Sequence, residues 1–263
     1  MQLRLGVVVS LAFGAILNAT PGAGALALVC AESGSTCNGA QARFQATGQF
    51  TSVDVFSATS STPALSAISG YGYVLAWTDY TPADPTALGN LLASYYDLGG
   101  KHLTIATYSF SNPWAMSGAV MSGNYAALTN VGSNGAVTGN IVTTVSDPIF
   151  SGINMSSVLF FHNTNYTHPG LAPGATLLAT DGAGVNMIAR SANGVIAANL
   201  FPGDQSPSNA AFYSLLAATL TNGTGGPAPA TTAGAPAIGP FAGLLLVAGM
   251  MAVAVYSLRR QSA

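Results

Sequence analysis

The chain of 263 residues has very little charge, because only 5% of its residues are Asp, Glu, Lys or Arg. Soluble domains ordinarily carry about a quarter. Nucleic-acid binding requires clustered Lys and Arg side chains, and six basic residues over the whole chain do not supply such a cluster. We therefore expect no nucleic-acid partner. With 49% hydrophobic residues, the folded surface must be kept soluble mainly by hydroxyl and amide groups.

Cysteine and histidine are also scarce, which limits thiol and metal chemistry. The two cysteines, Cys30 and Cys37, lie seven positions apart, and the three histidines are scattered. In an oxidising compartment the ordinary interpretation of such a pair is a disulfide that closes a small loop. A zinc site usually takes four ligands. We expect a disulfide, with no metal and no cofactor.

The first 25 residues have the pattern of a secretory signal peptide. Arg4 supplies a positive charge, residues 5–17 form an apolar segment, and Ala23-Gly24-Ala25 matches an A-x-A cleavage site. The apolar segment of 13 residues is too short to cross about 30 Å of hydrocarbon. Export therefore fits better than a retained first membrane helix.

The other end of the chain has the pattern of a membrane anchor. Residues 238–258 carry no charge and are followed by Arg259 and Arg260, so we expect a transmembrane helix and a short cytoplasmic basic tail over 259–263. Residues 223–237 form a Gly/Pro/Ala/Thr linker. The segment resembles the PEP-CTERM and IPTL-CTERM sorting tails of bacterial surface proteins, with PAIGP in place of their short motif. The tail is then either a permanent anchor or a processed one.

Residues 26–222 alternate between strand and helix patterns. This order predicts parallel strands joined by crossover helices, hence an α/β fold of the flavodoxin-like kind, a three-layer sandwich with a mostly parallel central sheet. Expected strands are 26–32, 53–57, 73–78 and 102–108, followed by shorter ones at 136–145, 159–162, 175–181, 186–191 and 194–201. Expected helices are 38–47, 63–69, 85–98 and 208–220.

The helix at 85–98 has the clearest local signals. Asp84 is placed to cap it and Pro85 to open it, and its apolar residues recur at helical spacing, namely Leu88, Leu91, Leu92, Tyr95 and Leu98. For the helix at 63–69, Thr62 is the expected cap and Pro63 the first residue. The final helix should bury Phe212, Leu215, Leu216, Thr219 and Leu220.

The segments LALVCAE, DPTALGNLLASYYDLGG and GVIAANLFPGD resemble the class I glutamine amidotransferase-like, ThuA-like domains. That resemblance implies a flavodoxin-type fold and a catalytic Cys after a central strand, with His and Glu partners. The comparable stretch here, TYSFSNPWAMSG, holds Ser109 and Ser111 but no Cys, and the chain has no G-x-S-x-G motif. A serine triad would need His162 or His168 with Asp181 or Asp204. The family's catalytic residues do not carry over, so we expect none.

In such sheets ligands bind at the carboxyl ends of the strands. The polar and aromatic residues expected there are the candidate ligand pocket: Glu32, Ser33, Thr36, Asp79, Tyr80, Ser109, Ser111, Asn112 and Trp114. The alternative is that Ser, Asp and Asn gather at these turns because they cap helices.

These features predict an exported, membrane-anchored domain at the cell envelope or surface, held by its C-terminal helix. Its expected role is binding or structural, with a polar or carbohydrate ligand or a cell-surface protein as partner. The alternative is an extracytoplasmic hydrolase or carbohydrate-active enzyme that uses Asp79, Asp84 or a Ser nucleophile. An enzyme should bring two titratable groups within hydrogen-bond reach, whereas a binding module should show an aromatic-walled or apolar surface.

Overall fold

The structure is a computed structural model that describes residues 24–129, 134–160, 166–203 and 208–223. Almost all of the expected signal peptide and linker, the expected transmembrane helix and the basic tail lie outside these residues. Within the described ranges no helix is both long and apolar enough to span a bilayer.

The centre of the domain is an eight-stranded sheet with the order β2-β1-β3-β4-β12-β11-β10-β7. The first five strands in this order are parallel, and the last three add in antiparallel fashion. Its strands are β1 (Ala25–Ala31), β2 (Ser52–Ser57), β3 (Tyr73–Thr78), β4 (His102–Ala106), β7 (Ile141–Thr143), β10 (Thr176–Asp181), β11 (Asn186–Arg190) and β12 (Ile196–Ala198). Two small ladders pair β5 (Leu128–Thr129) with β9 (Gly170–Leu171) and β6 (Asn134–Gly135) with β8 (Tyr166–Thr167).

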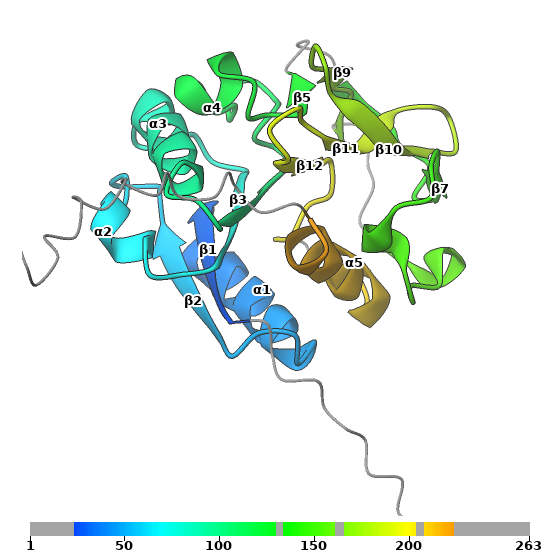
Figure 1. The fold of residues 1–263 in the computed structure, drawn as a ribbon, viewed down its shortest axis with the longest axis horizontal. Coiled ribbons are helices and arrows are strands. Elements are labelled where there is room, and N and C mark those ends of the chain that lie inside the picture. Colours follow the sequence, from blue (N-terminus) through cyan, green and yellow to red (C-terminus); the bar gives the residue numbers. More distant parts are fainter. Residues whose placement is uncertain (1–23, 130–133, 161–165, 204–207, 224–263) are drawn as a thin grey trace, which may run out of the picture. The chain divides into compact units, whose positions relative to one another are not determined.

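Helices cover both faces of the parallel part (Figure 1), which makes three layers. On one face lie α1 (Gly34–Ala46) and α5 (Ala210–Thr221). On the other lie α2 (Leu65–Ile68), α3 (Pro85–Tyr96) and α4 (Ala119–Ser122). Two short 3-10 helices, η1 (Pro148–Phe150) and η2 (Met155–Ser157), follow β7.

The central strands feed two separate hydrophobic cores. Along β1, Leu28 and Cys30 face the α1–α5 core, while Ala27 and Val29 face the α3 core. Strand β3 alternates in the same way. A strand buried on both faces needs apolar residues at successive positions, which is why the sequence there shows a continuous apolar run.

Helix α3 forms as its sequence predicts. The Asp84 carboxylate accepts hydrogen bonds from the backbone N–H groups of Thr86 and Ala87, both at 2.9 Å. Four residues of its predicted stripe are buried, but Leu98 lies beyond the helix and is 39% exposed. In α5 all five residues predicted to be buried are buried.

Three predicted elements are wrong in their bounds or their kind. Helix α1 begins at Gly34, four residues early, because the Ser33 hydroxyl caps it. Helix α2 begins at Leu65 without a side-chain cap, and the Thr62 hydroxyl is buried without a partner among the described residues. The strand predicted over 136–145 is reduced to β7, because Thr138 is tied to the turn after β10 by side-chain hydrogen bonds.

The strand predicted at 159–162 is also wrong for Leu159 and Phe160, while residues 161–162 lie outside the described ranges. The backbone N–H of Leu159 donates to the side chain of Asn209, the N-cap residue of α5, at 3.2 Å. This bond ties the segment to the start of a helix instead of to a neighbouring strand.

Candidate functional site

The carboxyl ends of four adjacent parallel strands meet at one edge of the sheet. Ala31, the last residue of β1, is opposite Thr78, the last residue of β3. Beyond them, the backbone N–H of Asp79 donates to the carbonyl of Ala31 at 2.9 Å, and that of Tyr108 donates to the carbonyl of Thr78 at 2.7 Å. We call this edge, from β1 to β12, the carboxyl edge. The chain order reverses between β1 and β3, which is where ligands bind in open α/β sheets.

Two predicted site residues, Glu32 and Asp79, interact directly at this reversal point. Glu32 follows β1 and is only 5% exposed, whereas Asp79 follows β3 and is half-buried. Glu32 Oε1 accepts a hydrogen bond from the Ser33 N–H at 2.7 Å. Oε2 is buried and receives no donor from the part of the chain that the structure describes. It is therefore the oxygen that can carry a proton shared with Asp79.

Burial raises the pKa of Glu32 to about 7; the hydrogen bond from Ser33 opposes this rise, and the charge and the hydrogen bond of Asp79 reinforce it. Burial also raises the pKa of Asp79, but its hydrogen bond with Glu32 acts in the opposite direction. Two carboxyl groups in contact do not ionise together easily, and less so where one of them is buried. Both shifts therefore favour retention of a proton by the pair to a higher pH than an isolated carboxyl group would allow.

Ser33 and Thr36 lie beside the acid pair at the start of α1. The Ser33 hydroxyl accepts a hydrogen bond from the Thr36 N–H at 3.3 Å and bonds the Thr36 hydroxyl at 2.7 Å. Ser33 is therefore the N-cap of α1, as expected if polar residues gather at these turns because they cap helices. A Cβ atom at Gly203 would lie 2.8 Å from Cγ2 of Thr36, so the segment after β12 approaches the start of α1 closely.

The predicted disulfide between Cys30 and Cys37 is confirmed. It joins β1 to the first turn of α1, and both cysteines are fully buried. The bridge therefore closes the loop that carries Glu32. It also leaves neither cysteine as a thiol nucleophile.

An aromatic cluster lies at the same edge. The ring of Tyr108, which follows β4, has its centroid 5.5 Å from Trp114, 5.3 Å from Phe201 and 5.8 Å from Tyr166. Trp114 was predicted as a site residue, whereas Tyr108, Phe201 and Tyr166 were not. Tyr80 is 48% exposed. A position at the end of a predicted strand was the one signal that could have singled out Tyr108.

The remaining predicted residues follow β4. Ser109 is fully buried, and its hydroxyl has no partner among the described residues. The Ser111 hydroxyl donates to the Asn134 side chain at 3.0 Å. Asn112 is exposed and precedes Pro113 through a cis peptide bond. These three residues lie near one another in sequence but do not form one cluster of contacts.

No serine triad assembles from the described residues. His168 bonds the carbonyl of Ala136 at 3.0 Å. Asp181 accepts backbone N–H groups of Thr138, Ala183 and Val185, which lower its pKa against the effect of burial. His162 and Asp204 lie outside the described ranges. In that part of the chain there is also no group of three or more metal-ligating side chains.

Buried polar side chains without partners gather toward the carboxyl edge, the donor Nε1 of Trp77 among them. Each of the four strands ends in, or is followed by, a buried side chain with an oxygen that has no partner among the described residues: Glu32 Oε2, Thr78 Oγ1, Ser109 Oγ and Asn199 Oδ1. We call these the strand-end oxygens. The Asn199 amide nitrogen donates to the carbonyls of Thr167 and Asn186, at 2.8 and 3.2 Å, so the orientation of its oxygen is fixed. Buried polar atoms without partners are uncommon in folded proteins.

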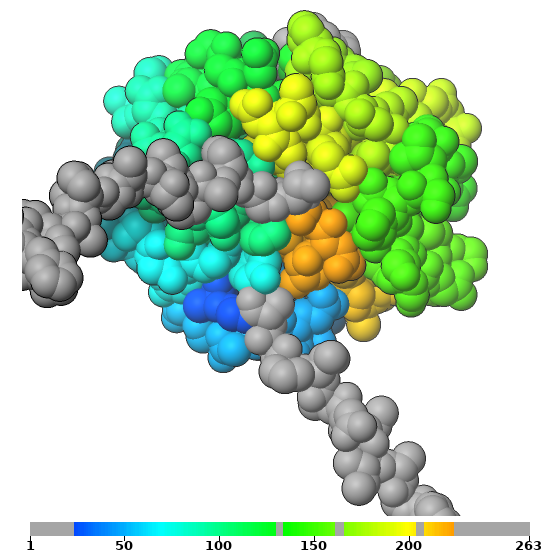
Figure 2. All heavy atoms as spheres, in the orientation of Figure 1, coloured from blue at the N-terminus to red at the C-terminus, as the bar shows by residue number. Residues whose placement is uncertain are grey.

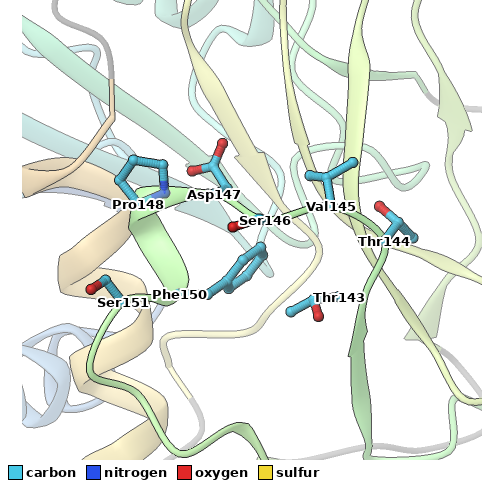
Figure 3. Close-up of a pocket in the computed structure, with 8 residues that line it drawn as sticks. All are labelled: Thr143, Thr144, Val145, Ser146, Asp147, Pro148, Phe150 and Ser151. Atoms are coloured by element: carbon cyan, nitrogen blue, oxygen red, sulfur yellow. The ribbon is translucent and has the colours of Figure 1, made fainter.

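Sequence reasoning missed a groove beside the edge strand β7. It has a volume of about 810 Å³ and is lined by residues 143–148, 150 and 151 (Figure 3). Figure 2 shows this part of the surface, in green, next to α5, in orange. Asp147 in its lining forms a bidentate ion pair with Arg190 at 2.8 and 3.0 Å. The charged residue of this lining is thus already paired.

Comparison with known proteins finds similarity among solved structures. No protein-family profile and no curated protein matches the chain. One similar solved structure is the cytoplasmic protein STM3548 from Salmonella typhimurium, with 9% identity and a TM-score of 0.47. The match covers 74% of this chain and 98% of that one. The amidotransferase-like resemblance stays a prediction.

Proposed function

We propose that this chain is an exported, membrane-anchored domain of flavodoxin-like, amidotransferase-like fold that binds a small polar ligand at its carboxyl edge. The observation that carries the proposal is the contact of the buried Glu32 with the half-buried Asp79 at the point where the strand order reverses. Such pairs of perturbed carboxyl groups in α/β sheets occur chiefly at functional sites.

The other acids at this edge argue that the pair does more than support the fold. Asp84 caps α3, and Asp181 binds the backbone of a turn. Asp79 accepts no N–H or hydroxyl hydrogen bond from the described residues, and its contact with Glu32 costs stability when both ionise.

Amidotransferase chemistry is not part of the proposal, because it needs a free thiol. Both cysteines of the chain are consumed by the disulfide. The hydroxyl of Ser109 is buried, and no described histidine contacts it.

A second candidate function is hydrolysis by an activated water. It is favoured by the contact of two carboxyl groups of which Glu32 has its pKa raised by burial, because such a pair can supply an acid and a base together. Asp79 would take a proton from the attacking water while Glu32 gives its proton to the carbonyl oxygen, which forms the tetrahedral intermediate. As the C–N or C–O bond then breaks, the proton on Asp79 would pass to the leaving amine or alcohol, and the proton of the re-forming carbonyl would return to Glu32. Glycosidases keep their two carboxyl groups about 5 Å or more apart. A hydrogen-bonded pair is closer than that, so an amide or ester is the better substrate class.

The test uses the full-length protein in detergent micelles. A panel of sugars, amines and short peptides is screened by the shift in melting temperature, with chromogenic esters and peptides as hydrolysis substrates. Binding should be lost in Asp79→Asn and Glu32→Gln and kept in Asp97→Asn, which removes a surface carboxylate that bonds Tyr125. Ligands that bind both site variants as tightly as the native protein would refute the site. Turnover abolished by both variants would favour the hydrolase.

A further inference from the structure

We propose that β7 is an interaction surface for a second copy of this chain, in which the two β7 strands pair antiparallel and join two sheets into one. The inference is independent of the proposed ligand site, because the carboxyl edge from β1 to β12 does not include β7. It follows from the free side of β7, from its exposed apolar side chain and from its lack of charge.

Strand β7 ends the eight-stranded sheet, so one side of it has no neighbouring strand among the described residues (Figure 1). On its other side, the Thr144 N–H donates to the carbonyl of Leu178 beside β10 at 2.9 Å, and Ala179 is opposite Thr143. Successive residues of an antiparallel strand point their backbone groups to opposite sides. The N–H and C=O groups of Ile141 and Thr143 therefore point away from β10, toward the free side.

The strand is complementary to itself. Two β7 strands that run antiparallel about a two-fold axis at Val142 place Ile141 of each copy opposite Thr143 of the other. These are the residues whose backbone groups point to the free side, so each such pair can exchange two hydrogen bonds. Val142 then lies opposite Val142 of the second copy, in a closely spaced pair whose side chains meet. Such an isologous contact closes and covers the free side of both strands.

Val142 is an exposed apolar side chain at the position of this axis. It is 50% exposed, although it lies in a strand of the central sheet. Residues 134–146 carry no charge, and Asp147, which follows them, is already in an ion pair. Two copies can therefore approach at β7 without repulsion between like charges.

The other edge strand of the sheet is protected against pairing, which favours β7 as the surface. Strand β2 carries Asp54 near its centre, and this carboxylate accepts hydrogen bonds from the hydroxyls of Tyr71 and Ser52 at 3.0 and 3.4 Å. A charge within an edge strand deters pairing with another chain. Strand β7 has neither a charge nor a proline, so it lacks these protections.

The pairing should be weak, because β7 is only three residues long. A contact of that length buries less than the about 1,200 Å² at the lower limit of most stable complexes. We therefore expect a dimer that exchanges with the monomer, and a covalent trap is the suitable way to detect it.

The experiment traps the dimer of the full-length protein in micelles by mild oxidation of Val142→Cys. The Cα atoms of a closely spaced antiparallel pair lie about 4.5 Å apart, a distance that a disulfide can bridge. Val145→Cys is the matched control, because Val145 is also exposed but its two copies would lie about 20 Å apart along the strands. We expect a covalent dimer from Val142→Cys and none above background from Val145→Cys.

Charge variants of the same residue test the two-fold axis itself. Val142→Lys and Val142→Asp each place like charges opposite each other. Each alone should weaken dimerisation about fivefold, measured by sedimentation equilibrium in density-matched micelles. A mixture of the two should restore a mixed dimer, because the facing charges are then opposite. Val142→Ile should leave dimerisation unchanged.

Each contrary outcome overturns the proposal. Equal trapping of Val142→Cys and Val145→Cys would show that the copies meet by random collision. Dimers that persist in both charge variants would place the contact elsewhere on the molecule. A native protein that stays monomeric, together with a Val142→Cys variant that is not trapped, would exclude a second copy. If that monomer binds a synthetic peptide of alternating Val and Thr, β7 serves a different chain.

Discussion

The two edges of the parallel sheet, the carboxyl edge and the opposite edge at which the strands begin (the amino edge), are built from the same strands but differ in how their charged side chains are paired. Lys101 precedes β4, and Arg190 is opposite the first residue of β12. At the amino edge, Lys101 donates to two carbonyls and Arg190 pairs with Asp147. At the carboxyl edge, Glu32 and Asp79 meet without a cation, and the strand-end oxygens have no donors among the described residues. Buried polar atoms without partners occur at both edges, since His102 Nδ1 and Arg190 Nε at the amino edge also have none among the described residues. The edges therefore differ in the pairing of their charges: the described cations bind carbonyls or a carboxylate at the amino edge, whereas two carboxyl groups face each other at the carboxyl edge.

Removing a charged side chain at the amino edge should therefore lower the free energy of unfolding, whereas removing the Glu32 carboxyl group at the carboxyl edge should raise it at pH 8. The largest loss should come at the amino edge from Arg190→Met, because Asp147, whose side chain is 7% exposed, then keeps its charge without a cation and retains the hydrogen bond from the Ile149 N–H. We expect a loss of about 3 kcal/mol in the free energy of unfolding. Urea unfolding of the full-length protein measures it. The double variant with Asp147→Asn should recover most of the loss, and equal losses in both would contradict the ion-pair account.

The disulfide is the main stabilising link at the carboxyl edge. Replacing both Cys30 and Cys37 by Ser opens the loop that carries Glu32, and should lower the free energy of unfolding by about 2 kcal/mol. Melting of the native protein with and without a reducing agent gives a second measure. An unchanged melting temperature in both experiments would show that the bridge contributes nothing.

Replacing the buried acid Glu32 should raise the free energy of unfolding at pH 8 instead of lowering it. In Glu32→Gln the amide oxygen still accepts from Ser33, and the amide N–H donates to Asp79 without a charge. Because the pKa of Glu32 is raised in the folded state, the stability that its protonated form contributes is fully present below pH 4.5. That contribution is lost as the pH rises through about 7. We therefore expect the variant to be more stable than the native protein by about 2 kcal/mol at pH 8 and equal to it at pH 4. A loss of stability at pH 8 would mean that Glu32 is there for the fold.

The smallest effect should come from Lys101→Met. This variant removes two hydrogen bonds to the carbonyls of Ser69 and Tyr71 and the contact of the ammonium with the Tyr95 ring, 5.7 Å from its centroid. The aliphatic stem of the side chain is kept. We expect a loss of about 1 kcal/mol by urea unfolding, independent of pH between 5 and 8. A pH-dependent loss would show that the two edges are electrostatically coupled.

Local signals in the sequence predicted much of the fold. The helix at Pro85 was identified because Asp84, the proline and the apolar spacing all agree. The parallel strands were identified from apolar runs separated by helices. The C-terminal half of the domain was predicted less well, because its strands are short and its backbone is tied by side chains, as at Thr138 and Asn209.

The sequence predicted which residues follow the strands at the candidate site, but not which of them contact one another. Glu32 and Asp79 lie after their strands as expected. Their contact depends on the register of β1 with β3, in which Ala31 is opposite Thr78, and no local pattern encodes that register. The packing of Phe201 on Tyr108 joins segments about 90 residues apart, so neither residue alone indicated an aromatic wall.

The Glu32–Asp79 pair is expected to keep a proton to near neutral pH. Titration of the Glu32 carboxyl carbon by 13C NMR, in the native protein and in Asp79→Asn, measures this. We expect the pKa of Glu32 to be about 7 in the native protein and lower in the variant, since the negative charge of Asp79 is then gone. A native midpoint near the ordinary glutamate value of about 4.3 would contradict it.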